Sequence, residues 1–240
     1  MTKLCLPKPS KREGRPFVFI NAAVSADGKL APDDRCFTPF TSPFDLRLLY
    51  KLRTRADAVL SGALTVSSGT VRMDSGGPRY EKARLEAGRS PALLKVIASG
   101  RALLDPTLPV FEDRASQVLL LTTSSADPRR LARLRPVLAE IHMSAGSTID
   151  WVAAMRWLSE KHGVESLVCE GGGEVNGAMI RAGLVDEVHL TLAPVLFGGR
   201  DAPTLADGTS PDFLSSASNF KLKHAFRRGN EMYLSYSAIR

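Results

Sequence analysis

The stretch Leu167-Val168-Cys169-Glu170-Gly171-Gly172-Gly173-Glu174-Val175-Asn176-Gly177-Ala178-Met179-Ile180 decides the fold class of this chain. A short apolar run ends at a carboxylate, three glycines follow, and a helix-forming segment then begins. This order predicts a strand, a tight turn and a helix N-terminus. Glycines let backbone N–H groups approach a phosphate, and the helix end adds partial positive charge. The stretch therefore predicts a cradle for a nucleotide pyrophosphate, with Glu170 facing the neighbouring ligand.

The same pattern also fits a strand-to-helix turn that binds nothing. Its spacing is neither G-x-G-x-x-G nor the G-K-[ST] of a Walker loop, so no standard nucleotide motif decides the question. Three consecutive glycines lose more backbone entropy than a plain turn requires, which favours the ligand.

Strand and helix patterns alternate along the rest of the chain. Apolar runs predict strands over 16–24, 57–62, 93–99, 117–123, 137–141 and 187–193. Helices are predicted from Ser42 to about residue 55, with Leu46, Leu49 and Leu52 on one side, and over 79–87, 128–134, 149–162 and the segment after the glycines up to Gly183. In the helix over 149–162, Val152, Met155 and Leu158 recur at helical spacing. Residues 220–226 and 232–238 read as an antiparallel hairpin. We therefore expect an α/β fold: a mixed, mainly parallel sheet with helices on both faces.

Bulk properties indicate a globular protein with a charged tail. Of the net charge of +7, residues 1–15 contribute +4, from five basic side chains and Glu13. We expect a flexible basic tail over 1–15 and one domain over 16–240. The charge left on the body is small and aromatic residues make up only 7% of the chain, so we expect no nucleic-acid partner.

Neither a membrane segment nor an export signal is visible. No apolar run is long enough to span a bilayer, and Leu4-Cys5-Leu6 is too short for the core of a signal peptide. We expect a cytoplasmic protein without a membrane partner.

Cysteine and histidine usage predicts neither disulfides nor a metal site. The three cysteines, Cys5, Cys36 and Cys169, share no C-x-x-C spacing. Cys169 lies inside an apolar run and reads as a small buried hydrophobe. The four histidines form no ligand pair.

Several motifs stand in a fixed order along the chain. They are Ser25-Ala26-Asp27-Gly28-Lys29-Leu30-Ala31, Leu52-Arg53, Gly62-Ala63-Leu64-Thr65-Val66, Glu170-Gly171-Gly172-Gly173 followed by Gly183-Leu184-Val185-Asp186-Glu187, and Ala193-Pro194-Val195-Leu196-Phe197-Gly198-Gly199. Together they resemble the reductase family of riboflavin biosynthesis, the RibD C-terminal domain, which is similar in fold to dihydrofolate reductase. The resemblance runs from about Pro16 to Ile239. Because no deaminase motif precedes it, the chain resembles the stand-alone form.

The resemblance implies a three-layer dihydrofolate reductase-like fold and a homodimer. It also implies an enzyme that uses NADPH to reduce the ribosyl group of a pyrimidine ribosylamine 5′-phosphate to a ribityl group. Glu170 would be catalytic and bind substrate, Arg53 would meet the substrate or its phosphate, and Asp27 is a second catalytic candidate. The cofactor would be bound by Ala23, Thr65, Ser99, Gly171, Gly172, Gly173 and Glu174.

Each implied role has a plainer alternative. Asp27 fits a structural turn, Glu170 could cap its own turn, and Arg53 could end its helix in solvent. The chain also departs from the family pattern, because Ser67–Met73 replaces an acidic D-D-P segment, leaving Gly69 in the place of an acid. In addition, Ala98-Ser99 stands for D-S, and a common tryptophan is replaced near Pro39.

The changed loop keeps a second function open. A reductase of the same fold could act on another carbonyl, imine or pterin-like compound, and a non-enzymatic basic binding module is a third reading. The intact Glu170 and glycines disfavour the third.

Overall fold

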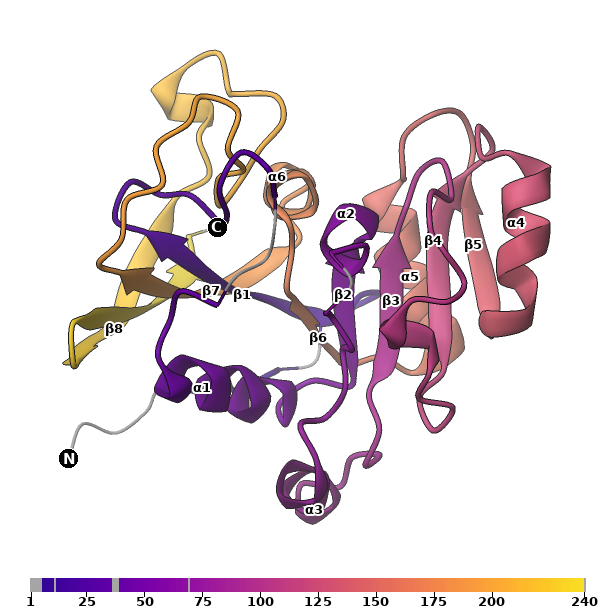
Figure 1. Cartoon of the computed structure of the whole chain (residues 1–240), viewed down its shortest axis with the longest axis horizontal. Helices are drawn as coiled ribbons and strands as arrows, with labels where there is room; N and C mark the ends of the chain where they lie inside the picture. Colours follow the sequence, from indigo (N-terminus) through magenta and orange to yellow (C-terminus); the bar gives the residue numbers. More distant parts are fainter. Residues whose placement is uncertain (1–5, 11, 36–38, 69, 240) are drawn as a thin grey trace.

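One nine-stranded sheet organises the chain in the computed structural model, which describes residues 6–10, 12–35, 39–68 and 70–239 (Figure 1). The strand order is β5-β4-β3-β2-β6-β1-β7-β9-β8. All pairs from β5 to β7 are parallel, and β9 and β8 are antiparallel. This confirms the predicted mixed, mainly parallel sheet with a C-terminal hairpin.

The strands are β1 (Phe17–Ser25), β2 (Ala58–Gly62), β3 (Leu94–Ala98), β4 (Val118–Thr123), β5 (Glu140–Ser144), β6 (Ser166–Cys169), β7 (Val185–Ala193), β8 (Phe220–Arg228) and β9 (Glu231–Ala238). The helices are α1 (Pro43–Arg53), α2 (Ala63–Val66), α3 (Pro78–Glu86), α4 (Pro128–Leu134), α5 (Trp151–His162) and α6 (Gly173–Arg181), with short 3₁₀ turns η1 (Pro109–Phe111), η2 (Arg135–Val137) and η3 (Leu214–Ser216).

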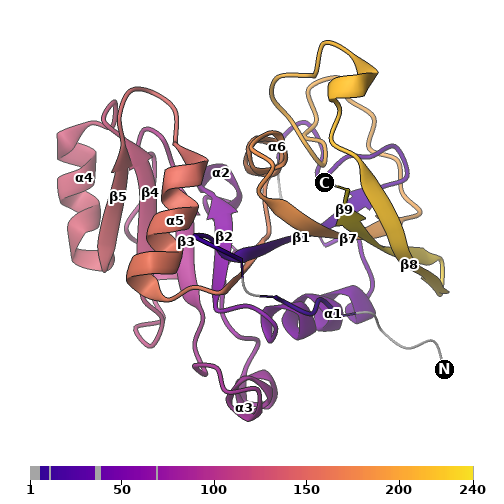
Figure 2. The same ribbon diagram turned by 180° about the vertical axis from the view of Figure 1, so that it is seen from behind.

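Helices cover both faces of the sheet, so the fold has three layers. On one face, Leu48 and Leu52 of α1 and Leu134 of α4 pack into one apolar cluster. On the other, Met155 of α5 and Met179 of α6 belong to a second cluster. Figure 2 shows α5 in front of the sheet, which partly covers this helix in Figure 1. Strands β2, β4 and β6 are buried along their whole length, which explains why each contains consecutive apolar residues instead of an alternation of apolar and polar ones.

Two predicted apolar faces were partly wrong. Leu46 of α1 is 53% exposed and Val152 of α5 is 52% exposed, whereas Leu48 and Ala154 are buried. A helix as short as α1 or α5 carries several apolar residues outside its contact stripe, so spacing alone does not decide which ones face the sheet.

The strand predicted over 137–141 begins later in the structure than expected. Residues 135–137 form the turn η2, and β5 begins at Glu140 rather than at residue 137. Pro136 lacks a backbone N–H for a strand ladder and instead continues the end of α4 as a 3₁₀ turn. The predicted cap at Gly183 is confirmed, since this residue has φ +66 and its N–H bonds to the Ile180 carbonyl.

The described part of the basic N-terminal segment contacts the body. Arg12 and Arg15 both pair with the buried Asp186, at 3.0 and 2.9 Å, and Pro7 is buried. These contacts hold residues 12–15 against β7. The domain boundary at residue 16 and the flexibility of 1–15 stay predictions, and Cys5, Cys36 and Gly69 lie outside the described residues.

Candidate functional site

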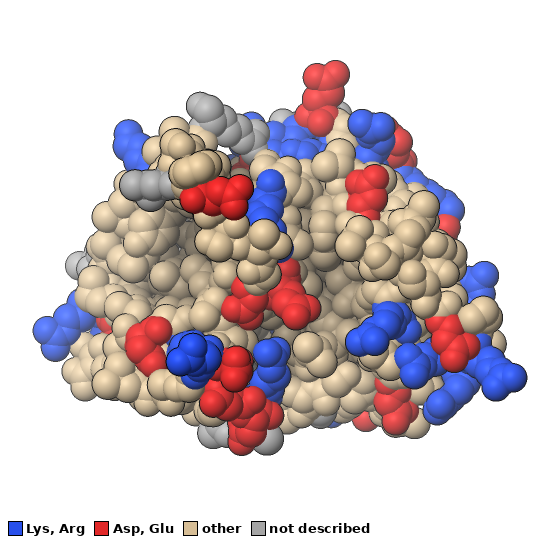
Figure 3. Space-filling view, turned by 90° about the horizontal axis from the view of Figure 1, so that it is seen from above, with Lys and Arg blue, Asp and Glu red and all other residues tan. Residues whose placement is uncertain are grey.

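A crevice opens at the carboxyl ends of the neighbouring strands β2 and β6. The chain leaves β2 into α2, whose Val66 packs on the α1 side of the sheet, and leaves β6 into α6, whose Val175 packs on the opposite side. Ligands of parallel α/β sheets bind where successive connections diverge in this way. Seen from this edge, the surface is hollowed and acidic side chains gather near its middle (Figure 3).

The glycine turn is fastened directly to the end of β2. The Gly171 carbonyl accepts hydrogen bonds from the Gly62 N–H at 2.7 Å and from the Ser61 hydroxyl at 3.2 Å. The Gly172 N–H donates to Thr65 Oγ1 at 3.0 Å. Predicted cofactor residues from two motifs more than a hundred residues apart therefore meet across the crevice.

The three glycines serve different purposes. Gly171 has φ +77, a conformation that favours glycine, and it lies against Asn176. A Cβ on Gly173 would overlap the Thr204 carbonyl and Asp207, whereas a Cβ on Gly172 would meet only Thr65 Oγ1, at 3.2 Å. Gly172 is thus the least closely packed of the three glycines, although its own N–H is taken by Thr65, and Gly173 packs against the 204–207 segment.

Sequence reasoning missed this 204–207 segment altogether. The Asp207 N–H donates to the Gly173 carbonyl at 2.9 Å, and Asp207 Oδ1 accepts from the Thr204 N–H and hydroxyl. Gly177 also lies against the Asp207 backbone. Only the extra glycine at 177 could have signalled that another segment approaches α6 this closely.

We expect Gly173→Ala to lower the free energy of unfolding by about 2–3 kcal/mol, because the added methyl group overpacks against backbone that cannot move aside. Urea unfolding followed by circular dichroism measures the change. Gly172→Ala is the matched comparison, and equal stability of the two variants would contradict the packing role of Gly173.

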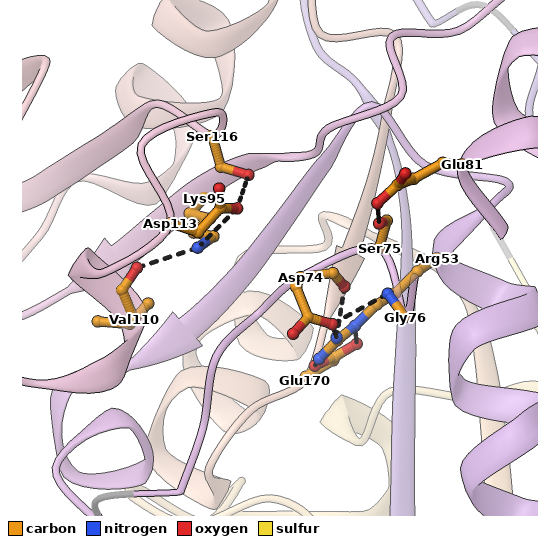
Figure 4. Close-up of polar contacts among 10 residues, drawn as sticks. All are labelled: Arg53, Asp74, Ser75, Gly76, Glu81, Lys95, Val110, Asp113, Ser116 and Glu170. Atoms are coloured by element: carbon orange, nitrogen blue, oxygen red, sulfur yellow. Dashed lines mark hydrogen bonds and ion pairs between the residues drawn. The ribbon is translucent and has the colours of Figure 1, made fainter. Parts of the chain in front are cut away.

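Arg53 and Glu170 form a buried, bidentate ion pair (Figure 4). Arg53 Nε and Nη2 donate to the two oxygens of Glu170 at 2.7 and 2.6 Å. Arg53 is 6% exposed. Burial by itself lowers the pKa of Arg53, but the charge and hydrogen bonds of Glu170, together with the nearby Asp74 and Tyr50, outweigh burial and raise that pKa. Arg53 therefore stays charged, and the two planar groups hold each other in one orientation.

A loop that the sequence analysis did not place at the site completes the surroundings of Arg53. Arg53 Nη1 donates to the Asp74 carbonyl at 2.7 Å, and the Asp74 carboxylate lies 3.8 Å away. The Arg53 guanidinium lies over the Tyr50 ring, 5.5 Å from its centroid. Gly76 packs on the same ring so closely that a Cβ would overlap it. Asp74 and Gly76, which come directly after the changed segment Ser67–Met73, thus lie beside Arg53 and Tyr50.

Asp27 lies in a turn, and its bonds explain it as a structural anchor. Its carboxylate accepts from the Ser25 hydroxyl at 2.6 Å, the Gly198 N–H at 2.7 Å and the Phe197 N–H at 3.2 Å. The bonds from Ser25 and Gly198 lower the pKa of Asp27 to about 2. Asp27 is therefore an anion at neutral pH and cannot donate a proton there, which favours the turn reading over a catalytic one.

The remaining predicted residues flank the crevice. Ala23 pairs with Thr191 near the carboxyl end of β1. Ser99 follows β3, and its hydroxyl accepts the Leu103 N–H at 3.0 Å. Glu174 is exposed in the first turn of α6.

Cys169, beside the glycine turn, is buried as predicted, and burial raises the pKa of its thiol to about 12. Among the described residues, no group of three or more histidine, cysteine or acidic side chains could hold a metal ion. Nor does any helix in the described ranges have the length and apolarity to cross a bilayer.

The motifs and the crevice geometry agree with a match to a known family. The family model of the RibD C-terminal domain matches residues 16–234. This chain is a member of the RibD C-terminal domain family. The predicted resemblance is thereby confirmed.

Relatives within the family are pyrimidine reductases and RibD proteins. The chain is 33% identical over 223 residues to 2,5-diamino-6-ribosylamino-4(3H)-pyrimidinone 5′-phosphate reductase of Methanothermobacter thermautotrophicus, covering 93% of this chain and 98% of the relative. The enzyme of the same name from Archaeoglobus fulgidus is 32% identical, with 82% and 88% covered. The RibD protein of Bacillus amyloliquefaciens is 30% identical, but the match spans only 50% of its length.

Solved structures show the same fold. A pyrimidine reductase-like protein from Corynebacterium diphtheriae superposes with a TM-score of 0.78 at 24% identity, over 94% of this chain and 92% of that one. RibD of Acinetobacter baumannii gives 0.75 at 19% identity, over 95% and 59%. The predicted dihydrofolate reductase-like fold of the RibD C-terminal domain is confirmed.

Proposed function

We propose that this protein uses NADPH to reduce the ribosyl group of 2,5-diamino-6-ribosylamino-4(3H)-pyrimidinone 5′-phosphate to a ribityl group, a step of riboflavin biosynthesis. The observation that carries the proposal is the carboxylate of Glu170, which Arg53 orients directly before the glycine turn at the N-terminus of α6. The diamino substrate is favoured over its deaminated counterpart because relatives named for it match along nearly their whole length, whereas RibD proteins match over about half of theirs.

The protein's part in this reaction is placement and electrostatics. Reduction adds a hydride to the imine carbon of the ring-opened ribosyl group and a proton to its nitrogen, and a nicotinamide cofactor supplies the hydride when bound. Each carboxylate oxygen can accept two hydrogen bonds, and Arg53 takes one on each oxygen of Glu170. The free positions let Glu170 accept from the substrate and stabilise a cationic imine.

Arg53 is proposed to orient Glu170 rather than to bind the substrate phosphate. Three of its N–H groups already donate to Glu170 and to the Asp74 carbonyl. A direct phosphate contact would have to break this buried arrangement or reach past it.

The assay of the proposal is NADPH oxidation, followed by absorbance, with the diamino- and the deaminated amino-pyrimidine ribosylamine 5′-phosphates offered in turn. Turnover of the diamino compound with formation of the ribityl product is expected. No oxidation with either compound would reject the proposal.

The second function is a reduction of another carbonyl, imine or pterin-like compound by the same site. It is favoured by the loop over 67–73, which departs from the family pattern and leads directly into Asp74, a hydrogen-bond partner of Arg53. Met73 in this loop is fully buried at φ +55, so the loop has a defined shape of its own. Oxidation of NADPH with such a compound, and not with either pyrimidine, would support this alternative.

Selection of NADPH over NADH is proposed to depend on Arg101. Ala23, Gly172, Thr65 and Ser99 stand at the ends of β1, β6, β2 and β3, which are successive neighbours in the sheet. These three strand spacings span about 14 Å, so a cofactor with its nicotinamide at Ala23 and its pyrophosphate at Gly172 would bring its adenosine ribose to Ser99. Arg101 is exposed two residues later, and within the described ranges it has no ion-pair or hydrogen-bond partner.

We expect Arg101→Gln to raise the KM for NADPH about 10- to 100-fold, because it removes a charge-assisted contact to the 2′-phosphate. The KM for NADH, which lacks that phosphate, should change little. Steady-state kinetics with both cofactors measure the difference, with the exposed Arg114→Gln as control. A parallel rise for both cofactors would contradict this role.

A homodimer and a cytoplasmic location stay proposals from the resemblance and from the sequence. The outer strand β8 carries Lys221, Lys223, Arg227 and Arg228, all exposed, so two copies of this edge would repel one another. We therefore expect any dimer to use another surface than this edge. Light scattering that gives a single species of 26.0 kDa at low micromolar concentration would reject the dimer.

A further inference from the structure

Arg84 is one of the largest fully buried side chains of the protein, at 1% exposure. It lies on α3, outside the crevice, and its guanidinium meets backbone carbonyls. Nη1 donates to the carbonyls of Arg53 and Ala56 at 2.6 and 2.7 Å, Nε to that of Ser90 at 2.8 Å, and Nη2 to that of Ala92 at 3.4 Å.

Burying the charged guanidinium of Arg84 has a free-energy cost, because the group loses its contact with water. Within the described part of the chain, no carboxylate lies within ion-pair distance of Arg84, and burial lowers the pKa of its guanidinium to about 10. It is still charged at neutral pH. The carbonyls at the C-terminal end of α1 carry partial negative charge and compensate part of the desolvation. An apolar side chain of similar volume would fill the same space but would leave these carbonyls without the Arg84 donors.

The position of Arg84 suggests a reason for this cost. Arg53 is the last residue of α1. Its backbone carbonyl accepts a hydrogen bond from Arg84, and its side chain donates to Glu170. The Asp74 carbonyl, from the loop that leads into α3, bonds the same Arg53 side chain. The two ends of the segment 74–84 thus both contact Arg53: Asp74 bonds the guanidinium, and Arg84 bonds the backbone carbonyl (Figure 4 shows the Asp74 contact).

We propose that Arg84 is a positioning residue for the Arg53–Glu170 pair: by fixing the end of α1, it sets where the Glu170 carboxylate meets the substrate. This inference rests on the proposed function, because it assigns Arg84 to the reaction carried out there. It touches neither substrate nor cofactor.

A double-mutant cycle tests the proposal. Arg84→Met should lower kcat about 10- to 50-fold in the otherwise unchanged enzyme, with the Kd for NADPH unchanged, and Arg84→Lys should restore part of the loss. In the Glu170→Gln background, Arg84→Met should lower kcat less than twofold further, because the group it positions is already lost.

A purely structural role predicts a different outcome. It would lower kcat by the same factor in both backgrounds, or would change only thermal stability, and either result overturns the proposal. Arg79→Met, an exposed change on the same helix, is the control. If Arg84→Met fails to fold, Arg84→Lys carries the same cycle.

A crystal structure of the Arg84 variant separates this proposal from the proposed function. If the unchanged enzyme reduces neither pyrimidine, the proposed function has failed, and the positions of Arg53 and Glu170 still report on Arg84. Displacement of the pair is expected, and bonds that stay at 2.7 and 2.6 Å would overturn the positioning role.

Discussion

Replacing Glu170 with glutamine is expected to lower kcat about 100- to 1,000-fold while NADPH still binds. The amide has nearly the same size but no negative charge to stabilise a cationic imine. It also offers one acceptor where Arg53 presents two donors, so one N–H of a buried guanidinium loses its partner. NADPH oxidation measures the rate, and a fluorescence titration measures cofactor affinity.

The same substitution should destabilise the fold, since breaking a buried ion pair from one side costs about 3–5 kcal/mol. Thermal unfolding of the variant must therefore be measured, and the assay run well below its Tm. Glu160→Gln, an exposed change on α5, is the matched control. Turnover by Glu170→Gln equal to that of the control would remove Glu170 from the mechanism.

Gly172→Val should weaken NADPH binding by about 100-fold or more, because a branched side chain would stand where the pyrophosphate approaches the backbone of the α6 N-terminus. Gly172→Ala should have a smaller effect, since its Cβ would meet only Thr65 Oγ1, at 3.2 Å. Fluorescence titration of both variants gives the graded change.

Ala139→Val is the control for the titration. It introduces the same branched side chain at an exposed position just before β5, away in sequence from the glycine turn. Unchanged NADPH affinity in Gly172→Val would contradict the placement of the pyrophosphate at this turn. Gly173→Ala does not provide this information, because its first effect is on the packing of the 204–207 segment.

The sequence by itself determined the features that depend on residues close to one another in the sequence. The glycine turn after β6, the cap at Gly183, the terminal hairpin and the alternation of strands and helices all follow from local spacing and backbone preference. The ordered motifs also identified Arg53 and Glu170, each separately, as candidates for the substrate site. These signals lie within one element or one turn, so they can be read without knowing the fold.

Only the tertiary structure decided what those residues contact. Arg53 and Glu170 are 117 positions apart, and nothing local to either predicts a bidentate pair. Gly173 faces a loop more than thirty residues later, so one of the glycines predicted to bind a phosphate also has a packing role that the sequence did not indicate. Contacts of this kind depend on how the sheet brings distant segments together. A local sequence pattern does not show which distant segment will lie against it.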